Sequence, residues 1–325
     1  MAKSVHTTFK VLGSLLFLAL PLYFLWPLAG AETATKARAT VGTEAAAVAV
    51  QEPKTAGSPE SIPVRSKAYA VIDGAGGQLL YAQECYEPLP PASTTKVLTA
   101  ITALDSAASV EQLITVSARA AKTGEATVHL RENDVLTLEE LLYGAMLESG
   151  NDACVAIAEG LAPSEEEFVA RMNLKAFTLG AYRTRFYNTN GLPDPLHVTC
   201  AADLALIARY ALANPTFAEI VKTQNHTMTW VEPQRKLRLK NLNLLLWLDE
   251  RITGVKTGST KAAGRCLVGS IDIDGRQLIG VVLNSQDRYR DMQALFSHGN
   301  QKLTGDAPVW TIPVWQEPDH VLIPD

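Results

Sequence analysis

Three short polar motifs in this 325-residue chain contain the residue types of a nucleophilic active site. The first is Ser93 followed by Lys96, a spacing that places both side chains on one face of a helix. A serine hydroxyl needs a base to become a nucleophile, and a lysine can be that base when burial lowers its pKa. Pro90 and Pro91 precede the pair, which predicts a helix beginning near Ser93. Taken alone, the pair also fits a helix-capping serine and a surface lysine.

The second motif is Ser149-Gly150-Asn151, which lies between an amphipathic segment at 138–147 and an alanine-rich helical segment beginning at residue 152. We therefore expect a tight turn between two helices. From such a turn Ser149 could relay a proton and Asn151 could hold a substrate amide. Ordinary turn chemistry uses the same residue types, so the motif is weak by itself.

The third motif is Lys256, Thr257, Gly258 and Ser259, just before a strand predicted to begin near residue 266. A lysine and hydroxyls on a strand edge could bind a substrate carboxylate, and Gly258 would let a substrate backbone approach closely. The backbone N–H groups of Ser259 and Ser93 could form an oxyanion hole. A similar segment, Lys122-Thr123-Gly124, lies in a polar stretch, and we interpret it as a solvated turn.

The elements that must position these motifs come from both ends of the folded region. Residues 69–73 and 78–83 predict a hairpin, and residues 266–273 and 277–284 predict another, joined through Asp274-Gly275. Between the hairpins, apolar residues recur at helical spacing. This order predicts an α+β fold, with an antiparallel sheet made from both chain ends and a helical region against it.

The N-terminal segment indicates export from the cytoplasm. Residues 11–28 are almost wholly apolar, and Ala29-Gly30-Ala31 fits a cleavage site, so residues 1–31 are either a signal peptide or a retained membrane anchor. Residues 32–66 contain no aromatic residue and predict a disordered linker. We expect a catalytic domain at 67–305 and a short tail at 306–325. Both interpretations of the N-terminus place the domain outside the cytoplasm.

Composition excludes several other classes of protein. A net charge of −5 argues against a nucleic-acid partner. The chain has no G-x-S-x-G elbow, no P-loop and no histidine spacing typical of zinc, so we expect no metal and no organic cofactor. We interpret His197 as structural. Two interpretations remain open for the four cysteines, namely disulfides or buried thiols: Cys85, Cys154, Cys200 and Cys266.

The three motifs, in this order, resemble those of the penicillin-recognising serine acyl-transferases, and in particular the low-molecular-mass D-alanyl-D-alanine carboxypeptidases. The resemblance covers about residues 68–299 and is carried by the segments 88–96, 146–153, 188–194 and 254–260. It implies a serine β-lactamase or DD-peptidase-like fold and a bacterial envelope enzyme with a role in the cell wall and cell shape.

The resemblance also implies roles for the motif residues. Ser93 would attack the carbonyl between the two D-alanines of a peptidoglycan stem peptide, with Lys96 as base, and β-lactams would acylate the same serine. Ser149 and Asn151 match the second family motif, and Lys256, Thr257 and Gly258 match the third. The family also uses an arginine near the last strand to bind the substrate carboxylate. Arg288 is our candidate, Arg290 is nearly as good, and a solvated surface arginine is the alternative.

Three other functions stay open at this point. A serine β-lactamase is one, although no convincing E-x-x-L-N stretch follows Ser149 and Glu165, Glu166 and Glu167 lead into an expected helix. A peptidoglycan DD-endopeptidase and a non-enzymatic penicillin-binding envelope protein are the others. Many relatives carry a C-terminal β-rich domain and a terminal membrane helix. We expect this chain to lack both and the N-terminal segment to substitute as a membrane tether.

Overall fold

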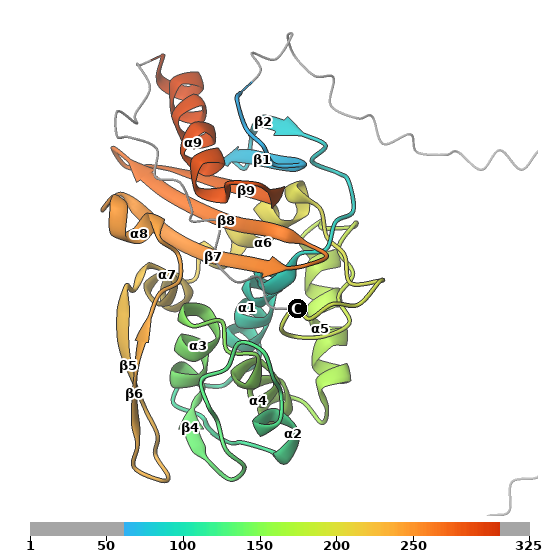
Figure 1. Cartoon of the computed structure of the whole chain (residues 1–325), viewed down its shortest axis with the longest axis vertical. Coiled ribbons are helices and arrows are strands. Elements are labelled where there is room, and N and C mark those ends of the chain that lie inside the picture. The colour runs from blue at the N-terminus through green and yellow to red at the C-terminus, as the bar shows by residue number, and fades with distance from the viewer. Residues whose placement is uncertain (1–61, 306–325) are drawn as a thin grey trace, which may run out of the picture. The chain divides into compact units, whose positions relative to one another are not determined.

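Two hairpins from the two ends of the described chain pair with each other in one antiparallel sheet (Figure 1). The computed structural model describes residues 62–305. β1 (Ala68–Asp73) and β2 (Leu79–Gln83) form one hairpin, and β8 (Gly264–Ile273) and β9 (Arg276–Ser285) form the other. β1 pairs with β9, so the strand order is β2-β1-β9-β8-β7. Both predicted hairpins and the α+β class are therefore confirmed.

The fifth strand, β7 (Ile252–Thr260), contains the third motif and forms one edge of the sheet. The motif was expected on a strand edge just before a strand beginning near residue 266, and β8 does begin at Gly264, but β7 itself was not predicted as a strand. Lys256 pairs with Val268 and Ser259 with Arg265, so the motif lies within the ladder itself. Gly254, Lys256 and Gly258 interrupt the β-branched residues of this strand, so it lacks a regular apolar alternation, which explains why it was not predicted.

α9 (Arg288–Thr304) covers one face of the sheet. The Asp287 side chain caps this helix by accepting a hydrogen bond of 3.2 Å from the Arg290 N–H. Met292, Leu295 and Phe296 form a buried cluster with the sheet residues beneath them. Gly269 pairs with Gly280 across β8 and β9, and a Cβ at Gly269 would lie only 3.1 Å from the Met292 side chain. These small residues let α9 pack closely onto the strands.

The helical region lies against the opposite face (Figure 1). Here α6 (Ala201–Leu212) packs on β1 and β9, and α1 (Lys96–Ser106) packs on α6. Around α1 lie α3 (Leu138–Leu147), α4 (Asn151–Leu161) and α5 (Glu165–Thr178). Thr137 and Ser164 cap α3 and α5 by accepting hydrogen bonds from backbone N–H groups, as the sequence rules for helix starts require.

Smaller elements complete the described part. They are the helices α2 (Ala118–Ala121), α7 (Pro215–Lys222) and α8 (Leu245–Leu248), and the two-stranded pairs β3 (Leu113–Thr115) with β4 (Val135–Thr137) and β5 (Asn225–Thr229) with β6 (Lys236–Lys240). Across residues 62–305, no helix is both long and apolar enough to cross a bilayer.

The folded part begins slightly earlier than the sequence suggested. Residues 62–66 were expected to belong to a disordered linker, yet Ile62 is buried in the cluster beneath α9 and the Arg65 N–H donates to Asp291 Oδ1 at 2.9 Å. The rest of that linker, the expected signal or anchor at 1–31 and the expected tail at 306–325 lie outside the described residues.

The four cysteines are all buried free thiols. The disulfide interpretation is therefore wrong, and the buried-thiol interpretation is confirmed. Burial raises the pKa of both Cys154 and Cys266 to about 11, so these thiols stay protonated near neutral pH.

Candidate active site

Ser93 and Lys96 lie together at the junction of a short 3-10 helix and α1. Ser93 belongs to the 3-10 helix η1 (Ala92–Thr95), and Lys96 is the first residue of α1. The Lys96 Nζ lies 3.0 Å from Ser93 Oγ. Ala92, just before the serine, has φ of 49°, a left-handed conformation that non-glycine residues rarely adopt. Such strain is typical of a position that the surrounding structure holds for function.

Lys96 is fully buried, and two further acceptors hold its amine. Nζ donates to Asn151 Oδ1 at 2.7 Å and to the Asn190 backbone carbonyl at 2.6 Å. Burial lowers the pKa of Lys96 to about 8, although the nearby Cys154, Asp152 and Glu125 act in the opposite direction. The alternative of a surface lysine is therefore wrong, because this amine is desolvated and within reach of the serine hydroxyl.

The second motif forms the predicted turn between α3 and α4. Ser149 is buried and has φ of 65°, and Asn151 begins α4. The Asn151 side chain uses both ends, since Oδ1 accepts from Lys96 and Nδ2 donates to the Gly124 carbonyl at 3.0 Å. This arrangement connects the second motif to the first.

The loop at 124–130 supports the second motif, although no residue type in the sequence predicted this contact. The Asn151 N–H donates to the Ala126 carbonyl at 2.7 Å, and the Asp152 carboxylate accepts from the N–H groups of Val128 and Leu130. Lys122 is exposed, as expected of a solvated turn, but the backbone of Gly124 contacts Asn151. Backbone carbonyls leave no residue-type signal, so the sequence could not reveal this contact.

The third motif approaches the first through Gly258. A Cβ at this position would lie 2.9 Å from Ser93 N and 3.0 Å from the Pro91 carbonyl oxygen. Only glycine therefore allows β7 to lie directly against η1. Lys256 and Thr257 are buried in the same strand. Burial lowers the pKa of Lys256 well below its usual value, and repulsion from Lys96 and Arg288 adds to that effect.

Arg288 rather than Arg290 contacts the third motif. Its Nη1 donates to the Gly258 carbonyl at 3.1 Å and to Ser259 Oγ at 2.8 Å, and the residue is buried at the start of α9. The backbone N–H of Arg290 takes part in the helix cap, and this residue is partly exposed. The alternative of a solvated surface arginine is therefore wrong for Arg288. The two arginines are only two residues apart, so the sequence could not show which of them faces β7. That depends on the position of α9.

His197 contacts η1 through Thr95. Its Nε2 is 2.9 Å from Thr95 Oγ1, its Nδ1 accepts from the Tyr187 N–H at 3.1 Å, and its ring stacks on Phe186. Burial lowers the pKa of His197 to about 4. A cavity of about 230 Å³ opens here, and its lining includes His197, Pro91, Leu192 and Thr260. The cavity adjoins the turn at Pro91 and Ala92 that precedes Ser93.

Comparison with known proteins agrees with this geometry. A family model described as D-alanyl-D-alanine carboxypeptidase matches residues 52–287. The chain is 34% identical over 224 residues to the D-alanyl-D-alanine carboxypeptidase DacF of Bacillus subtilis, covering 68% of this chain and 57% of that protein. It is 34% identical over 252 residues to DacB2 of Mycobacterium tuberculosis, covering 74% of this chain and 84% of that protein.

Among solved structures, the chain is similar to the Streptomyces K15 DD-transpeptidase, with a TM-score of 0.69 and 29% identity, over 73% of this chain and 97% of that one. The α+β fold is therefore of the DD-peptidase type. The chain spans little more than half the length of DacF.

Proposed function

The chain belongs to the D-alanyl-D-alanine carboxypeptidase family, and from that premise we propose that it is a serine D-Ala-D-Ala carboxypeptidase that trims peptidoglycan stem peptides. The observation that carries the proposal is the buried amine of Lys96, 3.0 Å from Ser93 Oγ and held by Asn151. The desolvated amine has a pKa low enough to accept the serine proton near neutral pH.

In the proposed reaction, Ser93 Oγ forms a bond to the carbonyl carbon between the two D-alanines while Lys96 takes its proton. The C–N bond then breaks, and the terminal D-alanine leaves after its nitrogen receives a proton through Lys96 and Ser149. Water hydrolyses the resulting ester and frees Ser93. A positioned base contributes about 10²- to 10⁴-fold to such a reaction.

The cationic groups near β7 fit the substrate's terminal carboxylate. Lys256, Thr257 and Ser259 would bind it, and Arg288 would add positive charge while fixing the Ser259 hydroxyl. The backbone N–H groups of Ser93 and Ser259 would stabilise the oxyanion, which the close approach at Gly258 supports. None of these steps requires a metal or an organic cofactor.

We place this activity in the bacterial envelope, where stem peptides occur. The expected export signal or membrane tether at 1–31 belongs to the same proposal, because both interpretations carry the catalytic domain out of the cytoplasm. β-Lactams would act as covalent inhibitors, since their strained amide would acylate the same serine.

The test combines fluorescent-penicillin labelling with D-alanine release from a stem pentapeptide. We expect labelling at Ser93 by mass mapping, a complete loss of label and of D-alanine release in Ser93→Ala, and unchanged values in the exposed-site control Ser109→Ala. Persistent labelling of Ser93→Ala would show that Ser93 is not the nucleophile.

Other outcomes identify the alternatives. Rapid turnover of penicillin would indicate a β-lactamase, and preferential cleavage of cross-linked dimers would indicate an endopeptidase. Labelling of the wild type without D-alanine release would indicate a binding protein. The β-lactamase alternative has little support around α5, because the buried Glu165 carboxylate is already hydrogen-bonded to Thr189 and Arg119.

A further inference from the structure

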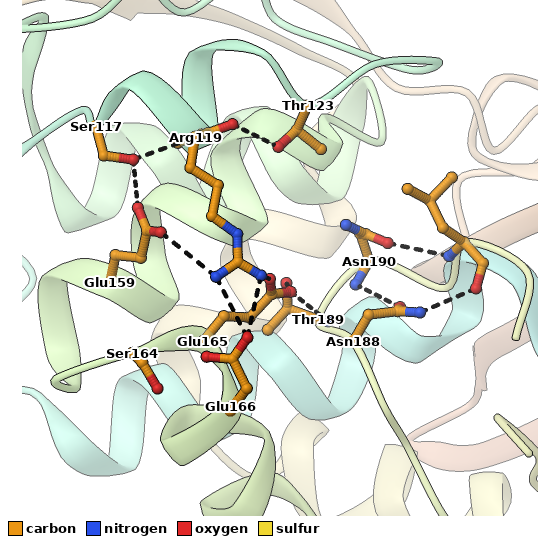
Figure 2. A network of polar contacts seen from close by, with 12 residues as sticks. Ser117, Arg119, Thr123, Glu159, Ser164, Glu165, Glu166, Asn188, Thr189 and Asn190 are labelled. Carbon is orange, nitrogen blue, oxygen red and sulfur yellow. Dashed lines mark hydrogen bonds and ion pairs between the residues drawn. The ribbon is translucent and has the colours of Figure 1, made fainter.

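A buried carboxylate joins the start of α5 to the chain segment that contacts Lys96. Glu165 is the first residue of α5 and is only 6% exposed. Its Oε1 accepts hydrogen bonds from the Thr189 backbone N–H at 3.1 Å and from Thr189 Oγ1 at 2.8 Å. Its Oε2 accepts from Arg119 Nη2 at 2.7 Å. Figure 2 shows Thr189 and Arg119 around this carboxylate.

Packing alone does not explain this carboxylate. Burying a charged group is costly unless hydrogen bonds replace its water, and Glu165 has three such bonds. Arg119 also contacts Glu159 and Glu166, whose side chains are 22% and 71% exposed, so the arginine does not depend on Glu165 for a partner. The contact that distinguishes Glu165 from these neighbours is the one to Thr189.

From Thr189 the connection to Lys96 runs through consecutive peptide units. Glu165 fixes the Thr189 N–H, and Thr99 Oγ1 donates to the Thr189 carbonyl at 2.6 Å. In the next unit the Gly191 N–H donates to Asn188 Oδ1 at 2.7 Å, while the Asn190 carbonyl accepts from Lys96. The Gly191 N–H lies in the same planar peptide unit as the Asn190 carbonyl, so its bond to Asn188 sets the direction of that carbonyl, while Glu165 anchors the segment two units earlier at Thr189.

That direction matters for the lone pair of the base. A neutral lysine amine has two N–H donors and one lone pair. If the donors bind Asn151 Oδ1 and the Asn190 carbonyl, the lone pair is left to face Ser93 Oγ. If the Asn190 carbonyl moves, the amine can rotate about the Cε–Nζ bond of Lys96, and the lone pair then no longer points at Ser93 Oγ.

We propose that Glu165 is a positioning residue for Lys96, acting through the backbone of Thr189 and Asn190. The inference rests on the proposed function, in which Lys96 is the base. Glu165 does not touch the reacting atoms, so its effect should fall on the rate and pH dependence of acylation. No sequence motif that we considered predicts this role, since Glu165 does not belong to an E-x-x-L-N stretch.

Several titratable groups interact electrostatically with Lys96, and Glu165 is not among them. They come from α4, the loop at 124–130, β7 and the segment after α5, and they are Asp152, Cys154, Glu125, Lys256 and His197. None of these residues is replaced in a Glu165 variant, although the Glu165 charge does contribute to the raised pKa of Cys154. Losing the Asn190 acceptor removes a hydrogen bond to the Lys96 ammonium, so the pKa of Lys96 should fall.

The experiment measures the rate of penicillin acylation from pH 6 to 10 for the wild type, Glu165→Ala and the control Glu166→Ala. Glu166 lies on the same helix and also pairs with Arg119, but it is exposed. We expect Glu165→Ala to lower the plateau rate about 10- to 100-fold, the loss typical of a displaced catalytic group. Its pH midpoint should lie below that of the wild type, and Glu166→Ala should match the wild type.

Folding is checked by near-UV circular dichroism and by the final extent of labelling. If Glu165→Ala does not fold, Glu165→Gln is measured in its place. Its amide oxygen can still accept one hydrogen bond from Thr189, so its plateau rate of acylation should fall by a smaller factor. A folded Glu165 variant whose rate and midpoint equal those of Glu166→Ala would overturn the inference. A wild type without acylation would overturn the proposed function itself.

Discussion

The acceptors around the Lys96 amine are all neutral. Nζ donates to a hydroxyl, an amide oxygen and a backbone carbonyl, with no carboxylate within hydrogen-bond distance in the described structure. Neutral acceptors solvate an ammonium without balancing its charge, so burial dominates and the pKa falls to about 8. A carboxylate at the position of Asn151 would instead hold Lys96 in its charged form.

This pKa predicts how acylation responds to pH. Only the neutral amine can accept the serine proton, so the rate should rise about tenfold per pH unit below pH 8 and level off above it. Stopped-flow acylation by a penicillin checks the profile. Lys96→Arg should be slow and show no such rise, because a guanidinium stays protonated. A wild-type rate that falls between pH 6 and 8 would contradict Lys96 as base.

At the scale of elements, the site exists because two backbone segments lie directly against the turn that carries Ser93. β7 approaches through Gly258, and the segment 188–192 approaches through Gly191. A Cβ at Gly191 would overlap the Ala92 carbonyl and lie 2.9 Å from Thr95 Oγ1. Side chains at either position would therefore separate the motifs, even though neither glycine takes part in the chemistry.

Gly191→Ala should therefore reduce both stability and acylation. The control is Gly180→Ala, since Gly180 has φ of 85° against 87° for Gly191 but nothing within 4 Å of its Cβ position. The left-handed conformation alone should cost about 1–2 kcal/mol in each variant. Only Gly191→Ala should also slow acylation, by about tenfold or more, because Ser93 must shift. Urea unfolding and penicillin labelling measure the two effects, and equal acylation rates in both variants would contradict the contact.

At the scale of the whole molecule, His197 connects the folding equilibrium to pH. Thr95 Oγ1 donates to the Ala92 carbonyl and so accepts from His197 Nε2, while Nδ1 accepts from the Tyr187 N–H. The neutral ring satisfies both contacts. A proton on Nδ1 would face another N–H donor, and burial already lowers the pKa of this ring to about 4.

The folded protein should therefore lose stability in mild acid. Below pH 6.5 the unfolded chain binds a proton that folded His197 does not, so the free energy of unfolding should fall by about 3 kcal/mol between pH 6.5 and pH 4. Buried Asp152 and Asp291 have raised pKa values and act in the opposite direction. The test is therefore the difference from His197→Gln, which should be less stable at pH 7 but decline less. Urea unfolding at pH 7 and pH 5 measures this for both proteins. An equal drop in the free energy of unfolding in the wild type and in His197→Gln would contradict this role.

The sequence by itself determined the residue types and their order. Ser93, Lys96, Ser149, Asn151 and Lys256 were singled out because three motifs, each weak alone, occur together in the order of a known family. The hairpins at both chain ends followed from short β-like runs joined by turn residues, at 74–77 in the first and at Asp274-Gly275 in the second, where the turn requires positive φ angles. Each of these motifs and hairpins depends only on residues close together in the sequence, so a single sequence was sufficient to detect them.

Only the tertiary structure decided which groups meet. It selected Arg288 over Arg290, placed the third motif within β7, and brought the Asn190 carbonyl and the Gly124 carbonyl to Lys96 and Asn151. It also left all four cysteines as buried thiols. Backbone carbonyls carry no residue-type signature, a glycine does not say which segment it lets approach, and contacts between residues far apart in sequence depend on how the whole sheet and helical region pack. Such contacts therefore stay hidden until the chain is folded.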